Sequence, residues 1–492
     1  MKKLKIVSVS SEVDPYSKTG GLADVARSLP KSLHRLGHDV MIVTPFYKKV
    51  IDQKKHKLEK IYSDVKVRID KKNEVKVSYY RTELLPGLRV YFVRNDKFFS
   101  RRKDLYGSSH ENARFYMFDV AVLKLISLLK HKADIIHCHD WQTGLIPYLK
   151  NTSFKKSQTM AKTATVFTIH NLVFQLGRNW WEIPLNKKDK GTGSLPLFND
   201  PNLEYVNFAK RAILNADALN TVSETYAEEI LKPSFGQDLQ RILINRKKKL
   251  FGVVNGIDNK EFNPNNDPSI KVNYDHKKLQ RKKINKKYIQ KLFKLPIRED
   301  VPVICSTSRL TYQKGFELIL RIIHKIMHFD MQMIIAGAGD KKYISELKKV
   351  AKKYPDKLVI IPSHEKTLKY ENQLYAGSDM ILIPSHHEPC GINQMKAFRY
   401  GCAPIVRSTG GLNDTVINYE PGNEGNGFKF KNFSSKELLV AITRALETYK
   451  YHKVWRDLIC RGMKPSFSWE HPAKKYIDLY KKALKFKKEK DE

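Results

Sequence analysis

The sequence is poor in cysteine and has no long hydrophobic run. It contains five cysteines among 492 residues, and no two of them form a C-x-x-C pair. An odd number of scattered cysteines disfavours both a disulfide framework and a zinc site, and fits a reduced cytoplasm. No apolar stretch approaches the roughly 20 residues that cross a bilayer, so we expect no membrane partner. The opening residues 1–15 run into Glu12 and Asp14 and predict a first strand rather than a signal peptide.

Acidic residues are also scarce. The chain has 51 Asp and Glu against 90 Lys and Arg, which gives a net charge of +39. Such an excess is typical of proteins that bind nucleic acids or anionic surfaces. The basic residues are spread along the chain, however, with local runs at 245–249, 281–287 and 480–490. Two of these runs have helix-like patterns and predict solvated faces, and no base-reading module accompanies them, so we expect no nucleic-acid partner.

Several catalytic patterns are missing as well. The sequence contains no nucleophile elbow, no protease triad, and no Asp-x-Asp or histidine cluster suited to a metal. We therefore expect no metal and no other cofactor.

What the chain does contain is a regular alternation of strand-like and helix-like segments, which predicts parallel sheets built from βαβ units. Pro30 lies inside the first helix and is expected to kink it. Five short apolar strands follow the Pro/Asn/Gly-rich connection 252–268, at about 301–308, 331–337, 357–363, 379–385 and 403–408. Helices are expected at about 21–38, 112–130, 141–150, 202–215, 314–328, 340–353, 366–376, 391–400, 411–419 and 468–489.

The length suits two domains of roughly 200 residues each. The fold class predicted is α/β, with two Rossmann-like doubly wound domains facing across a cleft. The C-terminal helix could return to either domain, and we assign it to the N-terminal one. The expected divisions are 1–250 for the N-terminal domain, 251–465 for the C-terminal domain and 466–492 for the last helix.

A short motif, Thr-Gly-Gly-Leu-x-Asp, occurs twice, at 19–24 and at 409–414. Each copy follows a β-rich segment and opens a helix, where glycine permits a tight turn and the helix N-terminus favours an anion. Lys18 precedes the first copy, and Arg309 and Lys314 lie on the loop after a second-half strand. These positions favour a diphosphate ligand at the strand ends.

Other polar residues follow strands in the same way. Such residues are often caps or hydrogen-bonded core groups, but a set of them at one sheet edge favours a hydroxyl-rich ligand. The members are Glu12, Asp24, Asp140, His170, Asn171, Asn255 and Glu388.

Eight segments occur in an order that resembles the bacterial glycogen synthases and plant starch synthases. They are SEVDPYSKTGGLADV, HCHDWQTG, FTIHNL, TVSETYAEEI, GVVNGID, SRLTYQKG, EPCG and STGGLNDTV. The resemblance covers about residues 4–480 and implies a GT-B fold. It also implies a cytoplasmic hexosyltransferase of glycogen biosynthesis, which transfers glucose with retention from ADP-glucose, or alternatively UDP-glucose, to the non-reducing 4-hydroxyl of an α-1,4-glucan.

The resemblance also implies roles for individual residues. The catalytic set would be Lys18, Asp140, His170, Arg309, Lys314 and Glu388. Lys18 is similar to the donor-binding lysine of the family, and Arg309 with Lys314 to its diphosphate pair. The substrate-binding set would be Glu12, Gly20, Gly21, Asp24, Tyr106, Asn171, Asn255, Cys390, Gly391, Thr409, Gly410 and Gly411.

The chain departs from the family pattern at three places. His386 and His387 stand where Arg-Phe is usual, and Ser363 or Lys366 stands where an aromatic residue commonly contacts the base. The loop after His170 differs too, with Glu204 at a position usually held by glycine. Trp180 and Trp181 in this loop have two interpretations, sugar stacking and core packing.

Two alternative functions remain open from sequence. The same twin fold serves other nucleotide-sugar transferases and epimerases, which would not lengthen a glucan. A non-catalytic protein that holds a polyanion through its charge is disfavoured, because the polar residues of the motifs are all present.

Overall fold

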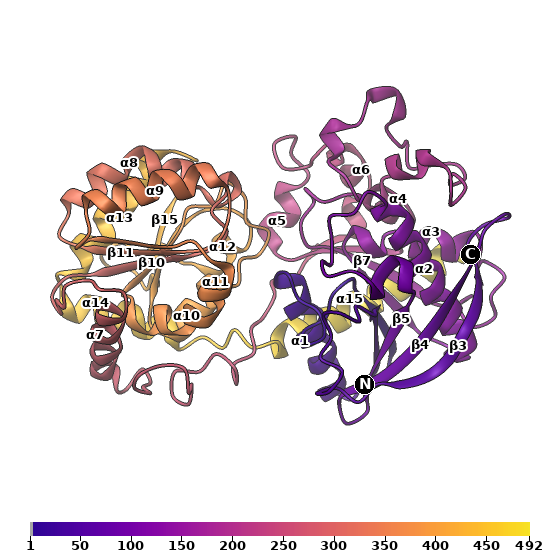
Figure 1. Ribbon diagram of the computed structural model, residues 1–492, viewed down its shortest axis with the longest axis horizontal. Helices are drawn as coiled ribbons and strands as arrows, with labels where there is room; N and C mark the ends of the chain where they lie inside the picture. Colours follow the sequence, from indigo (N-terminus) through magenta and orange to yellow (C-terminus); the bar gives the residue numbers. More distant parts are fainter. Residues whose placement is uncertain (1–2) are drawn as a thin grey trace. The chain divides into compact units, whose positions relative to one another are not determined.

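The computed structural model describes residues 3–492, which divide into two compact α/β units (Figure 1). The first unit is Met1–Asn255 together with Trp469–Glu492, and the second is Gly256–Ser468. The divisions expected from sequence, at 250 and 465, fall a few residues before these boundaries. None of the helices in residues 3–492 combines the length and the apolar character needed to cross a membrane.

The first unit is built on a nine-stranded sheet with the order β3-β4-β5-β2-β1-β6-β7-β8-β9. Its strands are β1 (Lys5–Val9), β2 (Asp39–Pro45), β3 (Glu59–Arg68), β4 (Glu74–Leu85), β5 (Leu88–Arg94), β6 (Ile135–His139), β7 (Ala164–Ile169), β8 (Ala218–Thr221) and β9 (Leu250–Gly252). Its α-helices are α1 (Gly21–Arg35), α2 (Glu111–Leu128), α3 (Ile146–Asn151), α4 (Phe208–Asn215), α5 (Glu224–Glu229), α6 (Gln240–Asn245) and α15 (Glu470–Asp491).

Only β3 and β4 depart from parallel pairing in this sheet. β3 pairs with β4, and β4 with β5, in antiparallel fashion, whereas the strands from β5 to β9 are all parallel. Without the β3–β4 hairpin the order runs outward in both directions from β1 and β6, as in a doubly wound sheet. The strand order therefore reverses between β1 and β6, which makes this the topological switch point.

Side chains on successive positions of β1 enter different cores. Ile6 packs in a cluster with α1 and α15, whereas Val7 packs in a cluster with α2. This alternation follows from the two-residue period of a strand and shows that helices cover both faces of the sheet. Helix α1 runs from Gly21 to Arg35 with the buried Pro30 inside it.

The second unit has a six-stranded parallel sheet with the order β12-β11-β10-β13-β14-β15. Its strands are β10 (Val303–Thr307), β11 (Gln332–Ala336), β12 (Leu358–Ile361), β13 (Met380–Ile383), β14 (Ala403–Arg407) and β15 (Phe428–Phe430). Its α-helices are α7 (Lys282–Leu292), α8 (Phe316–His328), α9 (Lys341–Lys353), α10 (His364–Gly377), α11 (Asn393–Arg399), α12 (Gly410–Thr415), α13 (Ser435–Tyr449) and α14 (His452–Met463).

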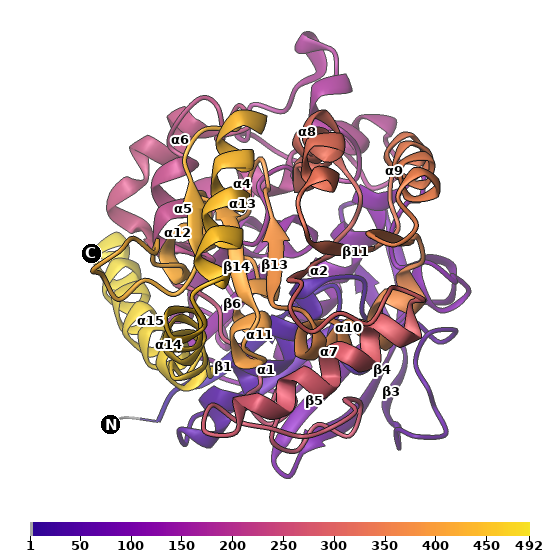
Figure 2. The ribbon, with the colours of Figure 1, turned by 90° about the vertical axis from the view of Figure 1, so that its left-hand side faces the viewer.

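This order is that of a Rossmann sheet, with its switch point between β10 and β13. Helices α8, α9 and α13 lie on one face, and α7, α10 and α14 on the other (Figure 1). Figure 2 shows the unit from another side, with β13 and β14 adjacent. The two units thus have the two doubly wound sheets that the sequence predicts.

The C-terminal helix α15 belongs to the first unit, where it packs beside α1 and against β7 and β8. Tyr480 of this helix shares a hydrogen bond of 2.9 Å with Nδ1 of the buried His137. The hydroxyl of Tyr476 accepts a 2.9 Å hydrogen bond from Asn220 of β8. Side chains of α15 therefore complete the polar core beneath β6, β7 and β8.

The basic run 281–287 does not form a fully solvated face, which corrects one expectation. Lys282 is buried, and its ammonium donates hydrogen bonds of 2.9, 2.9 and 3.0 Å to the carbonyl oxygens of Tyr375, Ala376 and Tyr400. These carbonyls lie at the C-terminal ends of α10 and α11, where a cation is favourable. Lys286 is buried as well and pairs with Asp379 at 2.8 Å.

Candidate active site

Several of the sequence-predicted residues follow the strands that flank the switch point in each unit. In the first unit Glu12 follows β1 and Asp140 follows β6. In the second unit Arg309 and Lys314 follow β10, and Glu388 follows β13. Open α/β sheets bind their ligands outside the carboxyl ends of these strands. Both units therefore place polar side chains where a ligand is expected.

Glu12 is buried and is held by the residue that precedes the first glycine pair. Its Oε2 accepts hydrogen bonds from the backbone N–H of Thr19 at 2.6 Å and from the Thr19 hydroxyl at 2.8 Å. Burial raises the pKa of Glu12 to about 7, while the two hydrogen bonds from Thr19 act in the opposite direction. This carboxyl group therefore exchanges its proton near neutral pH.

The first glycine pair opens α1 in an exposed position. Gly20 has an extended backbone, and a Cβ built on it would meet no protein atom within 4 Å. No side chain caps the first turn of α1, which begins at Gly21. The ammonium of Lys18 lies 2.5 Å from Oδ1 of Asp24, and both side chains are partly exposed. An uncapped helix N-terminus beside a lysine suits an anion.

Asp140 connects the ends of β6 and β7. Its Oδ1 accepts hydrogen bonds from the backbone N–H groups of His170 at 2.7 Å and Asn171 at 3.4 Å. Burial raises the pKa of Asp140 to about 7, and the charge of Glu12 contributes in the same direction. Asp140 has a φ of 59°, a left-handed conformation that non-glycine residues rarely adopt and that is common at functional sites.

His170 is fixed by a second histidine. Its Nε2 lies 3.0 Å from Nδ1 of His139, whose Nε2 lies 3.3 Å from the Ser8 hydroxyl. Burial lowers the pKa of His170 to about 3 and that of His139 well below its usual value. The imidazole of His170 is therefore neutral and oriented at neutral pH, so it can donate or accept one hydrogen bond but brings no charge.

Tyr106 and Asn255 complete the first unit's predicted set. The Tyr106 hydroxyl lies 2.7 Å from the hydroxyl of Ser11. Burial raises the pKa of Tyr106 well above its usual value, and the charges of Glu12 and Asp140 contribute in the same direction. Asn255 is buried and is the last residue of the range Met1–Asn255 of the first unit. Its Oδ1 has no hydrogen-bond partner among the described residues.

In the second unit the site is organised around an ion pair. The ammonium of Lys314 lies 2.5 Å from Oε2 of Glu388, and the Ser385 hydroxyl donates to the same oxygen at 2.9 Å. The side chains of Lys314 and Glu388 are 18% and 10% exposed. Arg309 lies on the same loop and is exposed. Sequence reasoning missed Ser385, although its place at the end of the expected strand 379–385, three residues before Glu388, was a signal.

The second glycine pair has a packing role that the first lacks. Gly410 has a φ of 44°, and a Cβ on it would lie 1.9 Å from the carbonyl oxygen of Glu388. A Cβ on Gly411 would lie 2.1 Å from the carbonyl oxygen of Cys390. Only glycine permits this approach, so the second copy supports the loop that carries Glu388. The two copies have the same sequence pattern but different surroundings.

Other residues that the sequence singled out have structural roles in the second unit. Thr409 is buried beside Gly410, and Gly391 has a φ of 71°, which the loop requires. Burial lowers the pKa of His387 to about 4, so this partly buried ring is neutral at neutral pH. Ser363 caps α10 by accepting from the backbone N–H of Lys366 at 3.3 Å, which gives its hydroxyl a structural role.

Neither a group of metal-binding side chains nor the concavity beside β4 coincides with these residues. Within residues 3–492 no three His, Cys, Asp or Glu side chains are grouped to hold a metal ion. A concavity of about 490 Å³ lies along β4 and the segment that follows β5, and its lining includes Lys60, Lys76, Arg94 and Lys97 but none of the predicted site residues. The position of the predicted residues at the strand ends, where open α/β sheets bind ligands, identifies the candidate site.

Comparison with known proteins identifies the class. Residues 5–245 match the family described as the starch synthase catalytic domain, and residues 288–457 match glycosyl transferases group 1. A glycogen synthase of Anoxybacillus flavithermus is 41% identical over 97% of both chains. One from Geotalea daltonii is 41% identical over 98% of this chain and 99% of its own. The catalytic domain of starch synthase IV from Arabidopsis thaliana, bound to ADP and acarbose, is 30% identical with a TM-score of 0.87, covering 98% of this chain and 100% of that one.

The two doubly wound units and their strand-end residues define a glycosyltransferase with the GT-B fold. The chain belongs to the glycogen and starch synthase family of these enzymes.

Proposed function

We propose that this enzyme transfers glucose, with retention of configuration, from ADP-glucose to the 4-hydroxyl at the non-reducing end of an α-1,4-glucan. One observation supports this proposal: polar residues of the motifs follow the strands beside each switch point, Glu12 and Asp140 in the first unit and the Lys314–Glu388 pair in the second. These positions are typical of nucleotide-sugar binding. The similarity to glycogen synthases supports the choice of acceptor.

In the reaction the bond between C1 of glucose and the diphosphate oxygen breaks, and ADP leaves with the electron pair. The acceptor oxygen O4 bonds to C1 on the same face, and its hydroxyl proton passes to the departing diphosphate or to solvent. Arg309 and Lys314 would stabilise the negative charge that grows on the departing diphosphate. Lys18, beside the uncapped N-terminus of α1, would bind an anionic group of the donor. Electrostatic stabilisation of this kind is usually the largest single contribution to rate.

The remaining groups would position the sugar and the nucleotide. Glu388, with the backbone at Cys390 and Gly391, would hold the glucose hydroxyls, since its carboxylate is fixed by Ser385. Asp140 and His170 would lie against the reacting sugar as fixed hydrogen-bonding groups. The supporting groups would be Glu12, Gly20, Gly21, Asp24, Tyr106, Asn171, Asn255, Thr409, Gly410 and Gly411.

ADP-glucose is favoured as donor because the similar starch synthase IV is bound to ADP. The five cysteines of the chain are free thiols, four of them buried, which supports a reducing compartment such as the cytoplasm.

The test is to incubate the enzyme with a glycogen primer and either ADP-glucose or UDP-glucose, with and without EDTA, and then to digest the product. We expect faster transfer from ADP-glucose, no loss in EDTA, and a product that an exo-acting α-1,4-glucan hydrolase removes. A faster rate with UDP-glucose contradicts the donor assignment. Inhibition by EDTA contradicts metal-independent transfer, and a resistant product contradicts the linkage.

A further inference from the structure

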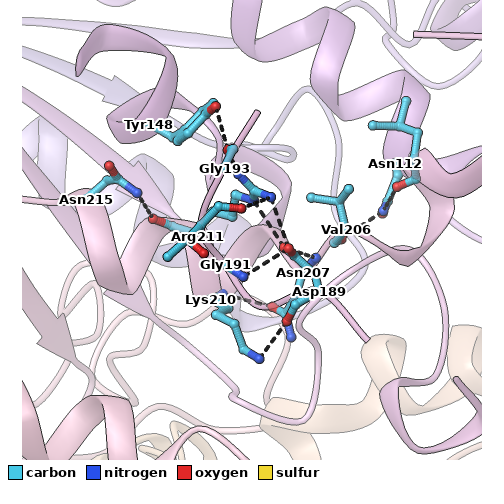
Figure 3. Close-up of polar contacts among 12 residues, drawn as sticks. Asn112, Tyr148, Asp189, Gly191, Gly193, Val206, Asn207, Lys210, Arg211 and Asn215 are labelled. Carbon is cyan, nitrogen blue, oxygen red and sulfur yellow. Dashed lines mark hydrogen bonds and ion pairs between the residues drawn. The ribbon is translucent and has the colours of Figure 1, made fainter. Parts of the chain in front are cut away.

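The segment 171–206, which connects β7 to α4, is anchored to the first unit by buried charges. The guanidinium of Arg211 donates two hydrogen bonds of 3.0 Å to the carboxylate of Asp189, and both side chains are less than a tenth exposed (Figure 3). Lys210 donates to the carbonyl oxygen of Asp189 at 2.8 Å. Near the end of the segment, Asn112 donates to the carbonyl oxygen of Val206 at 2.9 Å. These contacts hold the segment in a defined conformation on the first unit.

Two neighbouring tryptophans of this segment have opposite surroundings. Trp180 is 2% exposed, and its indole N–H donates to Oδ2 of Asp238 at 3.0 Å. Trp181 is 60% exposed, yet its indole N–H is also held, by Oε1 of Gln237 at 3.1 Å. Asn179 caps the short turn that carries both rings, accepting from the backbone N–H of Trp181. Trp180 is thus a core residue, whereas Trp181 presents an oriented ring to solvent.

The residues that hold these rings adopt an uncommon backbone. Gln237 and Asp238 are consecutive non-glycine residues with φ values of 49° and 69°. Two consecutive residues in this conformation raise the energy of the backbone. They persist where contacts with the surrounding structure offset that energy. Here the compensating contacts include the two indole hydrogen bonds and a hydrogen bond of 2.7 Å from Gln175 to the carbonyl oxygen of Gln237. The turn fixes the orientation of Trp181.

Lys188 covers part of both rings. Its ammonium lies 4.5 Å from the ring centre of Trp180 and 5.1 Å from that of Trp181, and 3.6 Å from Oδ2 of Asp238. Trp181 nevertheless remains mostly exposed to solvent. The protein therefore does not gain the free energy that burial of so large a ring would provide. An indole with a fixed N–H and an open apolar surface matches the C–H face of a pyranose ring, with polar groups nearby for its hydroxyls.

We propose that Trp181 is a second glucan-binding site, at which a glucosyl unit of the polymer stacks on the indole ring. The proposal rests on the proposed function insofar as an α-1,4-glucan is taken as the ligand. The site lies on the segment that begins directly after His170 and is distinct from the strand-end residues. A polymer bound at a second point is retained near the enzyme between transfers, which raises the effective concentration of its ends.

The test measures binding of the full-length enzyme to glycogen by its retardation in native gels that contain graded amounts of the polysaccharide. Trp181→Ala should bind about threefold to tenfold more weakly, since one aromatic stacking contact is lost. Trp181→Phe, which keeps an apolar ring, should retain most of the affinity. The affinity of Gln237→Ala for glycogen should lie between those of the wild type and Trp181→Ala, because the indole ring is then present but its N–H has lost the hydrogen bond to Gln237.

Leu185→Ala is the matched control, because Leu185 lies in the same segment and is 86% exposed but belongs to no such arrangement. It should bind glycogen and transfer glucose as the wild type does. In the enzyme assay Trp181→Ala should raise KM for glycogen by a factor similar to its loss of binding, with a smaller effect on kcat. A thermal midpoint close to that of the wild type checks that each variant is folded.

Failure of this inference can be told apart from failure of the proposed function. Lys314→Ala should lose transfer but keep wild-type retardation by glycogen, because Trp181 is intact. If the wild type transfers no glucose from any donor, the proposed function fails while the gels still report on Trp181. If the wild type is not retarded, or if folded Trp181→Ala is retarded as strongly as the wild type, the second site is refuted.

Discussion

At the scale of residues, the buried acids and the buried histidines of the first unit respond to pH in opposite directions. Burial raises the pKa of Glu12 and Asp140 to about 7, so the stability they contribute is present at low pH and is lost as the pH rises through 7. Burial lowers the pKa of His137 and His170 to about 3. Their contribution is present above the usual pKa of 6.5 and is lost as the pH falls toward 3.

The Glu12→Gln variant removes the ionisation of Glu12 and leaves that of the other buried groups, because an amide does not ionise. The thermal midpoint of the variant relative to the wild type should rise as the pH increases from 4.5 to about 7, where the wild type must ionise a buried carboxyl. Thermal melts across this range measure the difference. Glu346→Gln, at an exposed pair with Lys349, is the control and should give a constant difference. A pH-independent difference for Glu12→Gln contradicts the raised pKa.

Sequence patterns located the residues of the site but not their contacts. Lys314 and Glu388 were both predicted, since each follows a strand, yet they are 74 residues apart and nothing local indicated that they pair. The repeated glycines suggested equal roles, whereas Gly410 is required by the backbone of Glu388 and Gly20 is open. Lys282 looked like a surface residue because its partners are carbonyls of distant helix ends. Long-range partners of this kind leave no periodic signal.

At the scale of elements, α15 is tied to the sheet of the first unit by polar contacts as well as by apolar packing. His137 is buried between the Tyr480 hydroxyl at 2.9 Å and the Thr168 hydroxyl at 2.7 Å. The rings of His137 and His139 are 4.0 Å apart, and His139 in turn contacts His170. A chain of buried groups thus connects the C-terminal helix to the end of β7.

Tyr480→Phe tests this connection without changing the apolar packing. Loss of the hydroxyl leaves Nδ1 of His137 without its partner, which should lower the free energy of unfolding by about 1–3 kcal/mol. The shift should be seen in the thermal transition of the first unit. Lys485→Ala, at an exposed position of the same helix, should leave the transition unchanged. An equal stability of Tyr480→Phe and wild type would show that the bond does not contribute.

The periodic elements were the most predictable part of the fold. The five strands expected in the second half match β10 to β14, because each is a short apolar run between turn residues. The sixth strand, β15, was missed because Phe428–Phe430 is too short to show a period. Helices α13 and α14 were missed too, although the moderate amphipathic pattern of Ser435–Tyr449 was available as a signal.

At the scale of the whole molecule, the net charge of +39 is not required for binding a glucan, because a glucan is neutral. Retardation by glycogen should therefore change little between low and physiological salt. Binding to duplex DNA, if detectable at low salt, should weaken steeply over the same interval as counterions return. Parallel titrations of both ligands measure the contrast. Tight, sequence-selective DNA binding at physiological salt would show that the charge serves another function.

The central claim is that the residues beside the switch points perform glucosyl transfer. The most direct measurement is the initial rate at which Arg309→Ala and Lys314→Ala extend a glycogen primer with ADP-glucose, relative to the wild type. Each variant should lose about 10²–10³ in kcat, the typical effect of removing one stabiliser of a developing anion. Lys349→Ala, an exposed lysine of α9, should keep the wild-type rate. A near wild-type rate for folded Arg309→Ala or Lys314→Ala would contradict the account.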